Sequence, residues 1–376
     1  MGNQRLYLFL ICFCLLTSTP TLLWAQQNQS RTLSFSGDFR FRAEFDRDSQ
    51  RPDGTRRDDR DRLRFRARFG FNYQYDEHIS FGVRMRSGAA AATQSPHVTL
   101  GSELTLKTFS LDKAFVRVAS QSGSFWLGKN SFPFWKQNEL FWDDDATPEG
   151  AAGSYTVGIG EGSRLTATGG YFILDTPASN TFADQARLMA GQLVLKAGVN
   201  AGSAEVAGGF FAFRENPEQD DPRLEDLDYS IGVAGAKVAV NVGARPVEIG
   251  ADVMVNFEEY PASMFNHDQT TGYVASLTVG RLSKKKDWLL AYYYGHVQKY
   301  AVVGRYAQDD WVRWGSATAT RSSNFQGHEF RAALALGSKN NLVARLYVVE
   351  GVKRESPSAT AKEDGVRFRI DWNIGF

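Results

Sequence analysis

The sequence predicts an all-β chain that folds as a transmembrane antiparallel β-barrel of about 16 strands, with short periplasmic turns and long extracellular loops. Three observations predict it. After residue 25 no apolar run is long enough for a spanning helix, the segments alternate between apolar and polar residues, and the connections alternate between short and long. Only helices and closed barrels satisfy their backbone in lipid, so an exported chain of this kind is a barrel or a large periplasmic β-protein.

The last segment shows the alternation most clearly. One face holds Val366, Phe368, Ile370, Trp372, Ile374 and Phe376, and the other holds Arg367, Arg369, Asp371, Asn373 and Gly375. In a barrel the apolar face meets lipid and the polar face meets the lumen. A terminal Phe after such a strand resembles the C-terminal signal by which bacterial outer-membrane proteins are recognised for insertion. We therefore expect Trp372 and Phe376 to act as an assembly signal for the barrel assembly machinery.

The first three strands, 33–45, 62–75 and 79–86, repeat this pattern with arginines on the polar face. Thirteen further strands are expected at 104–119, 123–129, 151–158, 164–173, 187–199, 203–214, 227–242, 246–258, 271–281, 287–299, 324–337, 340–351 and 364–376. Lys113 and Lys237 interrupt the alternation of their strands, which predicts a β-bulge at each.

The connections alternate in length along the chain. Long polar loops are expected over 47–59, 90–103, 130–150, 174–186, 215–226, 259–270, 300–323 and 352–363, and short turns separate them. Short inner turns, long outer loops and an even number of strands are typical of outer-membrane barrels. A β-helix or a propeller would show a sequence repeat, and none is visible.

The N-terminus has the organisation of a cleaved secretory signal peptide. Arg5 supplies the positive charge, Leu6 to Leu16 the apolar region, and Leu23-Trp24-Ala25 the cleavage site. A membrane anchor is the alternative, which the short apolar run disfavours. We predict a signal peptide over 1–25 and a single barrel domain over 26–376, located in the outer membrane of a Gram-negative bacterium.

The composition excludes several classes of function. The formal net charge is +1, which falls to 0 once Arg5 is removed, so no basic excess indicates a nucleic-acid partner. Both cysteines, Cys12 and Cys14, lie in the signal peptide, so the mature chain has no disulfide and no thiolate metal site. No cofactor and no metal are expected.

A barrel of sixteen strands is too wide for its own side chains to fill, so something must narrow it. The third long loop, 130–150, is the candidate, because its aromatic residues can anchor it against the inner wall and its acidic run would then lie in the pore. The predicted constriction residues are Phe134, Trp135, Trp142, Asp143, Asp144, Asp145 and Glu149.

The arginines of the first three strands would face this loop. The predicted basic wall consists of Arg40, Arg42, Arg62, Arg64, Arg66, Arg68, Arg84 and Arg86. Cross-strand neighbours lie about 5 Å apart, so these charges need an offset, which the acidic loop would supply. The opposed charges would create a transverse field that favours polar solutes. The plainer alternatives are a solvated strand face for the arginines, and structural anchoring or a calcium site for the acidic run, whose spacing is unlike that of a calcium loop.

The chain resembles the putative porin family of Gram-negative outer membranes in three places. They are GDFRFRAEFDRD with RDRLRFRARFGF, then LGKNSFPFWKQNELFWDDDATPEG, and finally YYYGHVQKYAVVGRYAQDDW through GHEFRAALAL to RIDWNIGF. The resemblance implies a barrel pore for passive diffusion that forms a homotrimer. The Pro-Glu-Phe-Gly-Gly loop of the enterobacterial general porins is missing, so details of that constriction do not transfer.

The expected function is therefore a water-filled porin channel for small hydrophilic solutes and ions, with outer-membrane lipid and lipopolysaccharide as surroundings. A substrate-specific, anion-selective channel is the main alternative, since an arginine ladder could conduct anions. An outer-membrane barrel enzyme is less favoured, because the five histidines are not paired with a nucleophile and no Gly-x-Ser-x-Gly elbow occurs. A structural or adhesive barrel would need a plug or long repetitive loops.

Overall fold

The computed structural model describes residues 31–101, 104–175, 185–199, 202–215, 227–312 and 322–376. The predicted signal peptide and the fifth loop lie outside these residues, as does most of the fourth. All the strands of the described residues lie in one unit, Thr32–Phe376. Within the described residues, no helix has the length and apolarity needed to cross a membrane.

In the described residues, seventeen strands form one antiparallel sheet that closes on itself. Their bounds are β1 Thr32–Gln50, β2 Arg60–Gln74, β3 Ile79–Ser87, β4 Val98–Thr99, β5 Phe109–Ala119, β6 Gly123–Lys129, β7 Glu149–Gly158, β8 Ser163–Asp175, β9 Ala186–Val199, β10 Gly202–Arg214, β11 Tyr229–Val242, β12 Arg245–Asn256, β13 Thr271–Gly280, β14 Trp288–Val297, β15 Phe325–Gly337, β16 Asn340–Gly351 and β17 Asp364–Gly375. Sixteen of these strands form the wall of the barrel. The two-residue β4 belongs to the loop after β3 and pairs with Arg64 and Phe65 of β2.

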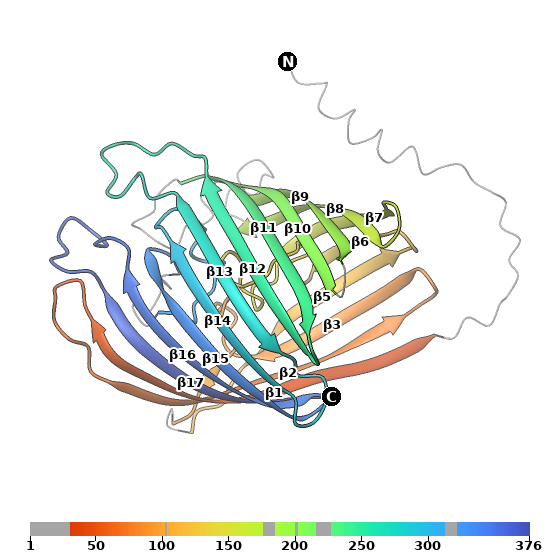
Figure 1. Ribbon diagram of the computed structural model, residues 1–376, viewed down its shortest axis with the longest axis horizontal. Helices are drawn as coiled ribbons and strands as arrows, with labels where there is room; N and C mark the ends of the chain where they lie inside the picture. Colours follow the sequence, from red (N-terminus) through yellow and green to blue (C-terminus); the bar gives the residue numbers. More distant parts are fainter. Residues whose placement is uncertain (1–30, 102–103, 176–184, 200–201, 216–226, 313–321) are drawn as a thin grey trace, which may run out of the picture. The chain divides into compact units, whose positions relative to one another are not determined.

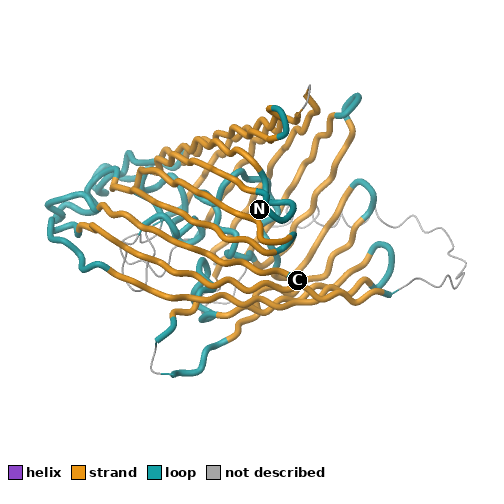
Figure 2. Tube along the Cα trace, turned by 60° about the horizontal axis from the view of Figure 1, so that its bottom comes forward, coloured by secondary structure: helices purple, strands orange, loops and turns teal. Residues whose placement is uncertain are grey.

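The barrel closes where β1 pairs with both β2 and β17, side by side in Figure 1. The prediction of a sixteen-stranded antiparallel barrel is confirmed. Consecutive strands are neighbours, so the long loops share one end of the barrel and the short turns share the other (Figure 2). The fourth predicted strand begins at Phe109 rather than at residue 104.

The outer face of the barrel is apolar, as the alternation predicts. Phe35, Leu63 and Phe69 are about half exposed, while Arg64, Arg66 and Arg68, which alternate with Leu63 and Phe69 along β2, are mostly covered. The ring of Phe376 lies over Gly37, and its backbone N–H donates to the Gly37 carbonyl at 3.0 Å. Trp372 donates from its indole Nε1 to Asn340 Oδ1 at 2.9 Å. Both predicted assembly residues thus lie on the outer face beside the closing seam, and their recognition stays a prediction.

One of the two predicted bulges is present. The pairing of β3 with β5 shifts between Arg84 and Met85, which face Lys113 and Leu111, so Asp112 is the extra residue. The bulge predicted at Lys237 is wrong, because β11 pairs in unbroken register with β10 and β12. Lys237 lies on the inner face, 3.7 Å from Glu205 and 3.6 Å from Glu248. The alternation of apolar and polar residues looked broken at Lys237 because apolar residues of β11, such as Tyr229 and Ile231, also face inward.

The inner face over β8 to β11 is apolar near the loop end, which differs from the polar lumen that the alternation predicts. Its fully buried residues are Phe172, Leu188, Phe211, Phe213, Tyr229 and Ile231. A water-filled barrel would expose such side chains to water, at a cost of about 1.5–3 kcal/mol each. They are buried because loops fold into the barrel and pack on them, so the hydrophobic core of this protein lies inside its lumen.

Candidate functional site

The third loop, which the structure bounds at 130–148, leaves the wall after β6 and packs its aromatic rings on the apolar inner face. The rings of Phe132 and Trp142 stack at 4.3 Å, and Phe134 meets Phe211 of β10 edge-on at 5.1 Å. Phe134 and Trp142 are 4% and 1% exposed. Each such pair contributes about 0.5–1.5 kcal/mol beyond its buried area. The loop is therefore held inside the barrel by burial, as its aromatic content predicts.

Hydrogen bonds fasten the middle of the third loop to the wall. The Trp135 backbone N–H donates to Gln192 Oε1 of β9 at 2.7 Å, and the Trp135 indole donates to Glu205 Oε2 of β10 at 2.6 Å. Further along, Gln137 Oε1 accepts from the Ser276 hydroxyl of β13 at 2.9 Å. A Cβ added at Gly250 of β12 would lie 1.9 Å from that amide oxygen, so the loop needs a glycine there.

The far end of the third loop reaches the arginines. Asp145 Oδ1 lies 3.0 Å from Arg68 Nη1, and Asp145 Oδ2 lies 3.6 Å from Arg66 Nη1. Arg86 Nη1 donates to the Asp145 carbonyl at 2.8 Å. The loop thus runs from β9–β13 on one side to β2 and β3 on the other, across the lumen.

The other predicted acidic residues do not face the arginines. Asp144 pairs with Lys136 of its own loop at 2.6 Å, which lowers its pKa against the effect of burial. Asp143 is 4% exposed and accepts from the Asp145 backbone N–H at 2.7 Å. Burial, and then the nearby Glu139, raise the pKa of Asp143 well above its usual 3.8. Glu149 belongs to β7 and pairs with Lys129 at 2.8 Å.

Of the four predicted acidic residues, Asp143, Asp144 and Glu149 thus contact other partners than the arginines, and the role of the set in a constriction stays a prediction. The run reads as one charged unit in the sequence, but a turn at Asp143 points successive side chains in different directions. Only Asp145 meets the wall.

Carboxylates on the strands of the wall itself supply most of the negative charge that compensates the arginines. Glu44 lies between Arg62 and Arg369, and Asp46 lies between Arg60 and Arg367, because β1 pairs with β2 on one side and β17 on the other.

The same arrangement continues along the wall. Asp371 accepts from Arg42 Nε at 2.6 Å, and Asp38 accepts from Arg66 and Arg68 at 2.7 Å each. Asp112, the bulge residue of β5, contacts Arg84 at 2.5 Å and Arg86 at 3.8 Å, both on β3. All eight predicted arginines lie on this inner wall. The seam of β17, β1 and β2, with β3, is a ladder of alternating charges, which we call the arginine wall.

The seventh loop, described over 298–312 and 322–324, also folds into the barrel, which the sequence reasoning missed. Tyr306 stacks on Trp142 of the third loop at 5.1 Å, and Tyr300, Val302 and Trp311 are at most 3% exposed. The apolar run from Tyr300 to Val303 was the available signal, because such a run is out of place in a solvated outer loop.

Asp310 connects the seventh loop to the arginine wall. Its Oδ1 lies 3.4 Å from Arg42 Nη1 and also contacts Arg369 Nη1. These arginines hold the pKa of Asp310 well below its usual 3.8, although burial opposes the shift. Asp310 of the seventh loop thus contacts arginines in the middle of the arginine wall, on β1 and β17. Asp145 of the third loop contacts only arginines at one edge of the wall.

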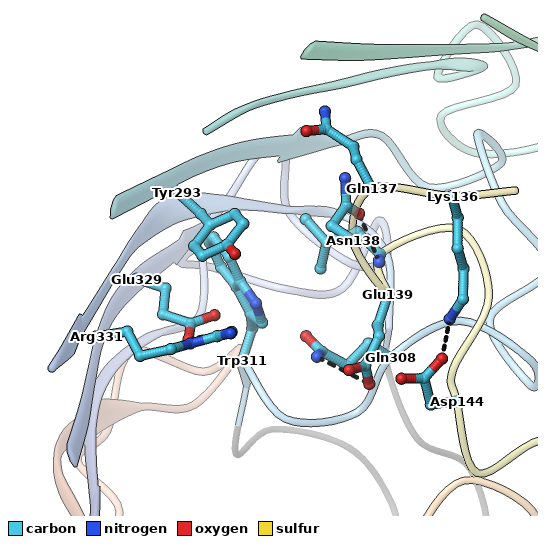
Figure 3. Close-up of a pocket in the computed structure, with 11 residues that line it drawn as sticks. Lys136, Gln137, Asn138, Glu139, Asp144, Tyr293, Gln308, Trp311, Glu329 and Arg331 are labelled. Carbon is cyan, nitrogen blue, oxygen red and sulfur yellow. Dashed lines mark hydrogen bonds and ion pairs between the residues drawn. The ribbon is translucent and has the colours of Figure 1, made fainter. Parts of the chain in front are cut away.

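A polar cavity of about 150 Å³ lies between the two inward loops and the wall of β14 and β15. Figure 3 shows Tyr293, Glu329 and Arg331 of the wall on one side, and Lys136, Glu139 and Asp144 of the third loop on the other. Arg331 pairs with Glu329 at 2.7 Å. The cavity is lined by paired opposite charges, the surface that a hydrated polar solute would meet.

Metal and cofactor binding find no support in the described residues. No group of three or more His, Cys, Asp or Glu side chains in these segments is arranged to hold a metal ion. The predicted absence of metal and cofactor stays a prediction.

Comparison with known proteins gives both a family and a fold. Residues 41–219 match a family described as "putative porin". This stretch takes in most of the first of the three resembling segments and all of the second, and leaves out the third. No curated protein matches the chain in sequence.

Several solved structures share the fold at low sequence identity. OprB of Pseudomonas putida is 13% identical, with 92% of this chain and 94% of that chain covered and a TM-score of 0.56. OmpF of Salmonella typhi, in a complex with daunomycin, is 11% identical, with 93% and 99% covered and a TM-score of 0.56. The trimer form of Vibrio cholerae OmpT is 12% identical, with 92% and 99% covered and a TM-score of 0.50.

The family match and the shared barrel place the protein in the outer membrane of a Gram-negative bacterium. The predicted resemblance is confirmed: the chain matches the putative porin family over residues 41–219, and its fold is that of the outer-membrane porins.

Proposed function

We propose that this porin is a channel for passive diffusion of small hydrophilic solutes and ions, narrowed between its two inward loops and its arginine wall. The observation that carries the proposal is the course of the third loop, which is fastened to β9, β10 and β13 and ends on Arg66 and Arg68. A loop held at both ends across a wide barrel reduces its cross-section and leaves a polar path beside it.

The proposal includes no catalytic role. His296 Nδ1 contacts Gln326 at 2.9 Å, and His328 Nδ1 contacts the Tyr292 hydroxyl at 2.9 Å. In the described part of the chain, no histidine contacts both a serine hydroxyl and a carboxylate, the arrangement that a barrel hydrolase would need.

The proposed assembly is a homotrimer in outer-membrane lipid and lipopolysaccharide, inserted by the barrel assembly machinery. The trimer form of Vibrio cholerae OmpT, a barrel of the same fold, supports this oligomeric state. A sizing measurement in detergent tests it, and a monomeric mass would contradict it.

Single-channel recording in a planar bilayer tests the main proposal. We expect steady, ohmic openings that pass both small ions and uncharged sugars. Folded protein that gives no conductance would overturn it. Small openings that one class of solute blocks would favour the second candidate, a substrate-specific anion channel, to which the excess of arginines on the wall points.

A further inference from the structure

The charge pairing of the arginine wall has a gap near Arg40. On β1 the inward residues are Asp38, Arg40, Arg42, Glu44 and Asp46, and each except Arg40 is ion-paired. Arg40 lies opposite Asn373 of β17 and opposite Arg66 of β2 in the ladder. Its Nε donates to Asn373 Oδ1 at 2.6 Å. Among the described residues, no carboxylate oxygen lies within 4.0 Å of its guanidinium.

Arg64, diagonally next to Arg40 on β2, is also poorly compensated. Its nearest carboxylate is Glu44, whose Oε2 lies 3.7 Å from Arg64 Nη1 and already pairs with Arg369 at 2.7 Å. Arg64 Nη2 donates to the Ser95 hydroxyl and the His97 carbonyl, both at 3.2 Å, and both of these partners are neutral. Its Nε is buried without a hydrogen-bond partner.

His97 of the second loop, described over 88–101 and 104–108, covers this part of the wall. Its Nε2 is buried and has no hydrogen-bond partner. Burial, and then the nearby Arg42, Arg40 and Arg64, lower the pKa of His97 well below 6.5. Asp310 of the seventh loop, which also contacts the wall, is already engaged by Arg42 and Arg369.

Two guanidinium groups short of acidic partners, beside a buried imidazole nitrogen that has no hydrogen-bond partner, form a region of excess positive charge suited to an anion. We propose that a small oxyanion, a carboxylate or a phosphate, binds on the arginine wall between Arg40, Arg64 and His97. This inference rests on the proposed channel function and specifies the class of solute that the channel holds on its way through. The oxyanion accepts hydrogen bonds from the guanidinium groups and supplies the negative charge that Asn373 does not.

The test is block of the channel by oxyanions. Chloride current through single channels is recorded while sodium formate or inorganic phosphate is added at constant ionic strength. We expect one of them to reduce the current in a saturable way, and the more effective one identifies the oxyanion. Arg40→Gln and Arg64→Gln should each raise the half-blocking concentration about tenfold, the loss of a hydrogen bond to a charged group.

Arg84→Gln is the matched control, because it removes the same charge from an arginine that Asp112 already pairs. It should leave the half-blocking concentration within about twofold, a purely long-range effect. Equal effects of Arg40→Gln and Arg84→Gln, or current through open wild-type channels that neither oxyanion reduces, would overturn the site.

Direct binding separates this proposal from the channel function. Calorimetric titration of formate and of phosphate into folded protein in detergent micelles needs no conductance. Saturable binding that Arg40→Gln weakens and Arg84→Gln does not would support the site even if the protein proved not to conduct. The absence of binding to well-folded wild-type protein would exclude it.

Discussion

Asp145 is the residue through which the third loop meets the arginine wall. Its neighbour Asp144 carries the same charge but pairs with Lys136 of the loop itself. The two residues therefore form a matched pair: neutralising either removes one carboxylate from the same loop, and only one of them lies against the wall.

Replacing Asp145 by Asn should leave Arg66 and Arg68 with Asp38 as their shared acidic partner and increase the positive potential of the lumen. We expect the ratio of chloride to potassium permeability to rise about twofold or more, because a charge close to the ion path is poorly screened. Reversal potentials in a salt gradient measure this. Asp144→Asn should change the ratio less, and an equal change in both variants would show that only net charge matters.

His97 gives a pH dependence to the stability. Its folded-state pKa lies well below 6.5, so below about pH 6.5 the unfolded chain binds a proton that the folded chain does not. The free energy of unfolding should therefore fall as the pH drops from about 6.5 toward the folded pKa, by at most about 1.4 kcal/mol per pH unit. Urea unfolding at several pH values in vesicles measures the slope.

His97→Gln should flatten that slope. A slope that is identical in the wild type and in His97→Gln would show that His97 is not the group that titrates.

The direction of each arginine could be predicted from alternation, but its partner could not. A period of two assigns Arg42 and Glu44 to the lumen without fixing which residues of β17 lie opposite them. The register of the closing seam places Asp371 and Arg369 there, and that register joins segments from the two ends of the sequence. The partners of the acidic run in the third loop could not be predicted for a related reason, because side chains in a loop follow no alternation.

At the scale of elements, the third and seventh loops form one packed body inside the barrel. The backbone N–H of Asp143 donates to the Tyr306 carbonyl at 2.7 Å, which links the two loops directly. The inward position of the third loop was predictable from its aromatic residues. The inward position of the seventh loop was missed because polar residues dominate its composition. Its short apolar run is nevertheless of the same apolar character as the inner face of β8 to β11.

Gly250 tests how closely the third loop must approach the wall. Replacing it by Val should displace Gln137, break its hydrogen bond to Ser276 and lower the free energy of unfolding by about 1–3 kcal/mol through overpacking. The single-channel conductance should change in the same variant. Gly208→Val is the control, because a Cβ at Gly208 meets nothing within 4 Å. Conductance and stability that are unaltered by Gly250→Val would show that the loop is not held there.

At the scale of the whole molecule, the barrel could be predicted almost completely and its interior only in part. Lipid imposes a strict alternation on the outer face of every strand, and this pattern is legible in the sequence. The lumen imposes no such rule, because loops, ion pairs and water can each satisfy an inward residue. Sequence reasoning therefore found the sixteen strands of the barrel wall and missed the hydrophobic core inside the lumen.

Substitution of Phe376 tests whether the end of the last strand acts as an assembly signal. Phe376→Ala removes a ring that lies over Gly37 beside the seam and is 61% exposed, so the direct loss of stability should be about 1 kcal/mol. If the residue is an assembly signal, the folded fraction in the outer membrane should fall much further than this. Heat-modifiable migration on gels measures that fraction. Phe35→Ala removes a ring with 59% exposure from the same face and should assemble normally, and equal assembly of both variants would contradict a signal role.

The charge ladder at the seam has a consequence for the order of folding. Arg42, Glu44 and Asp46 on β1 each take one of their charged partners from β17, the last strand in the chain: Asp371, Arg369 and Arg367. Leaving one such buried charge without its partner costs about 3–5 kcal/mol. A chain without β17 thus leaves Arg42 without Asp371, and leaves Glu44 and Asp46 with only their β2 partners, Arg62 and Arg60, so it gains less by closing early. The charge ladder therefore favours the complete barrel, because β1 gains all of its ion pairs only when β17 has paired with it.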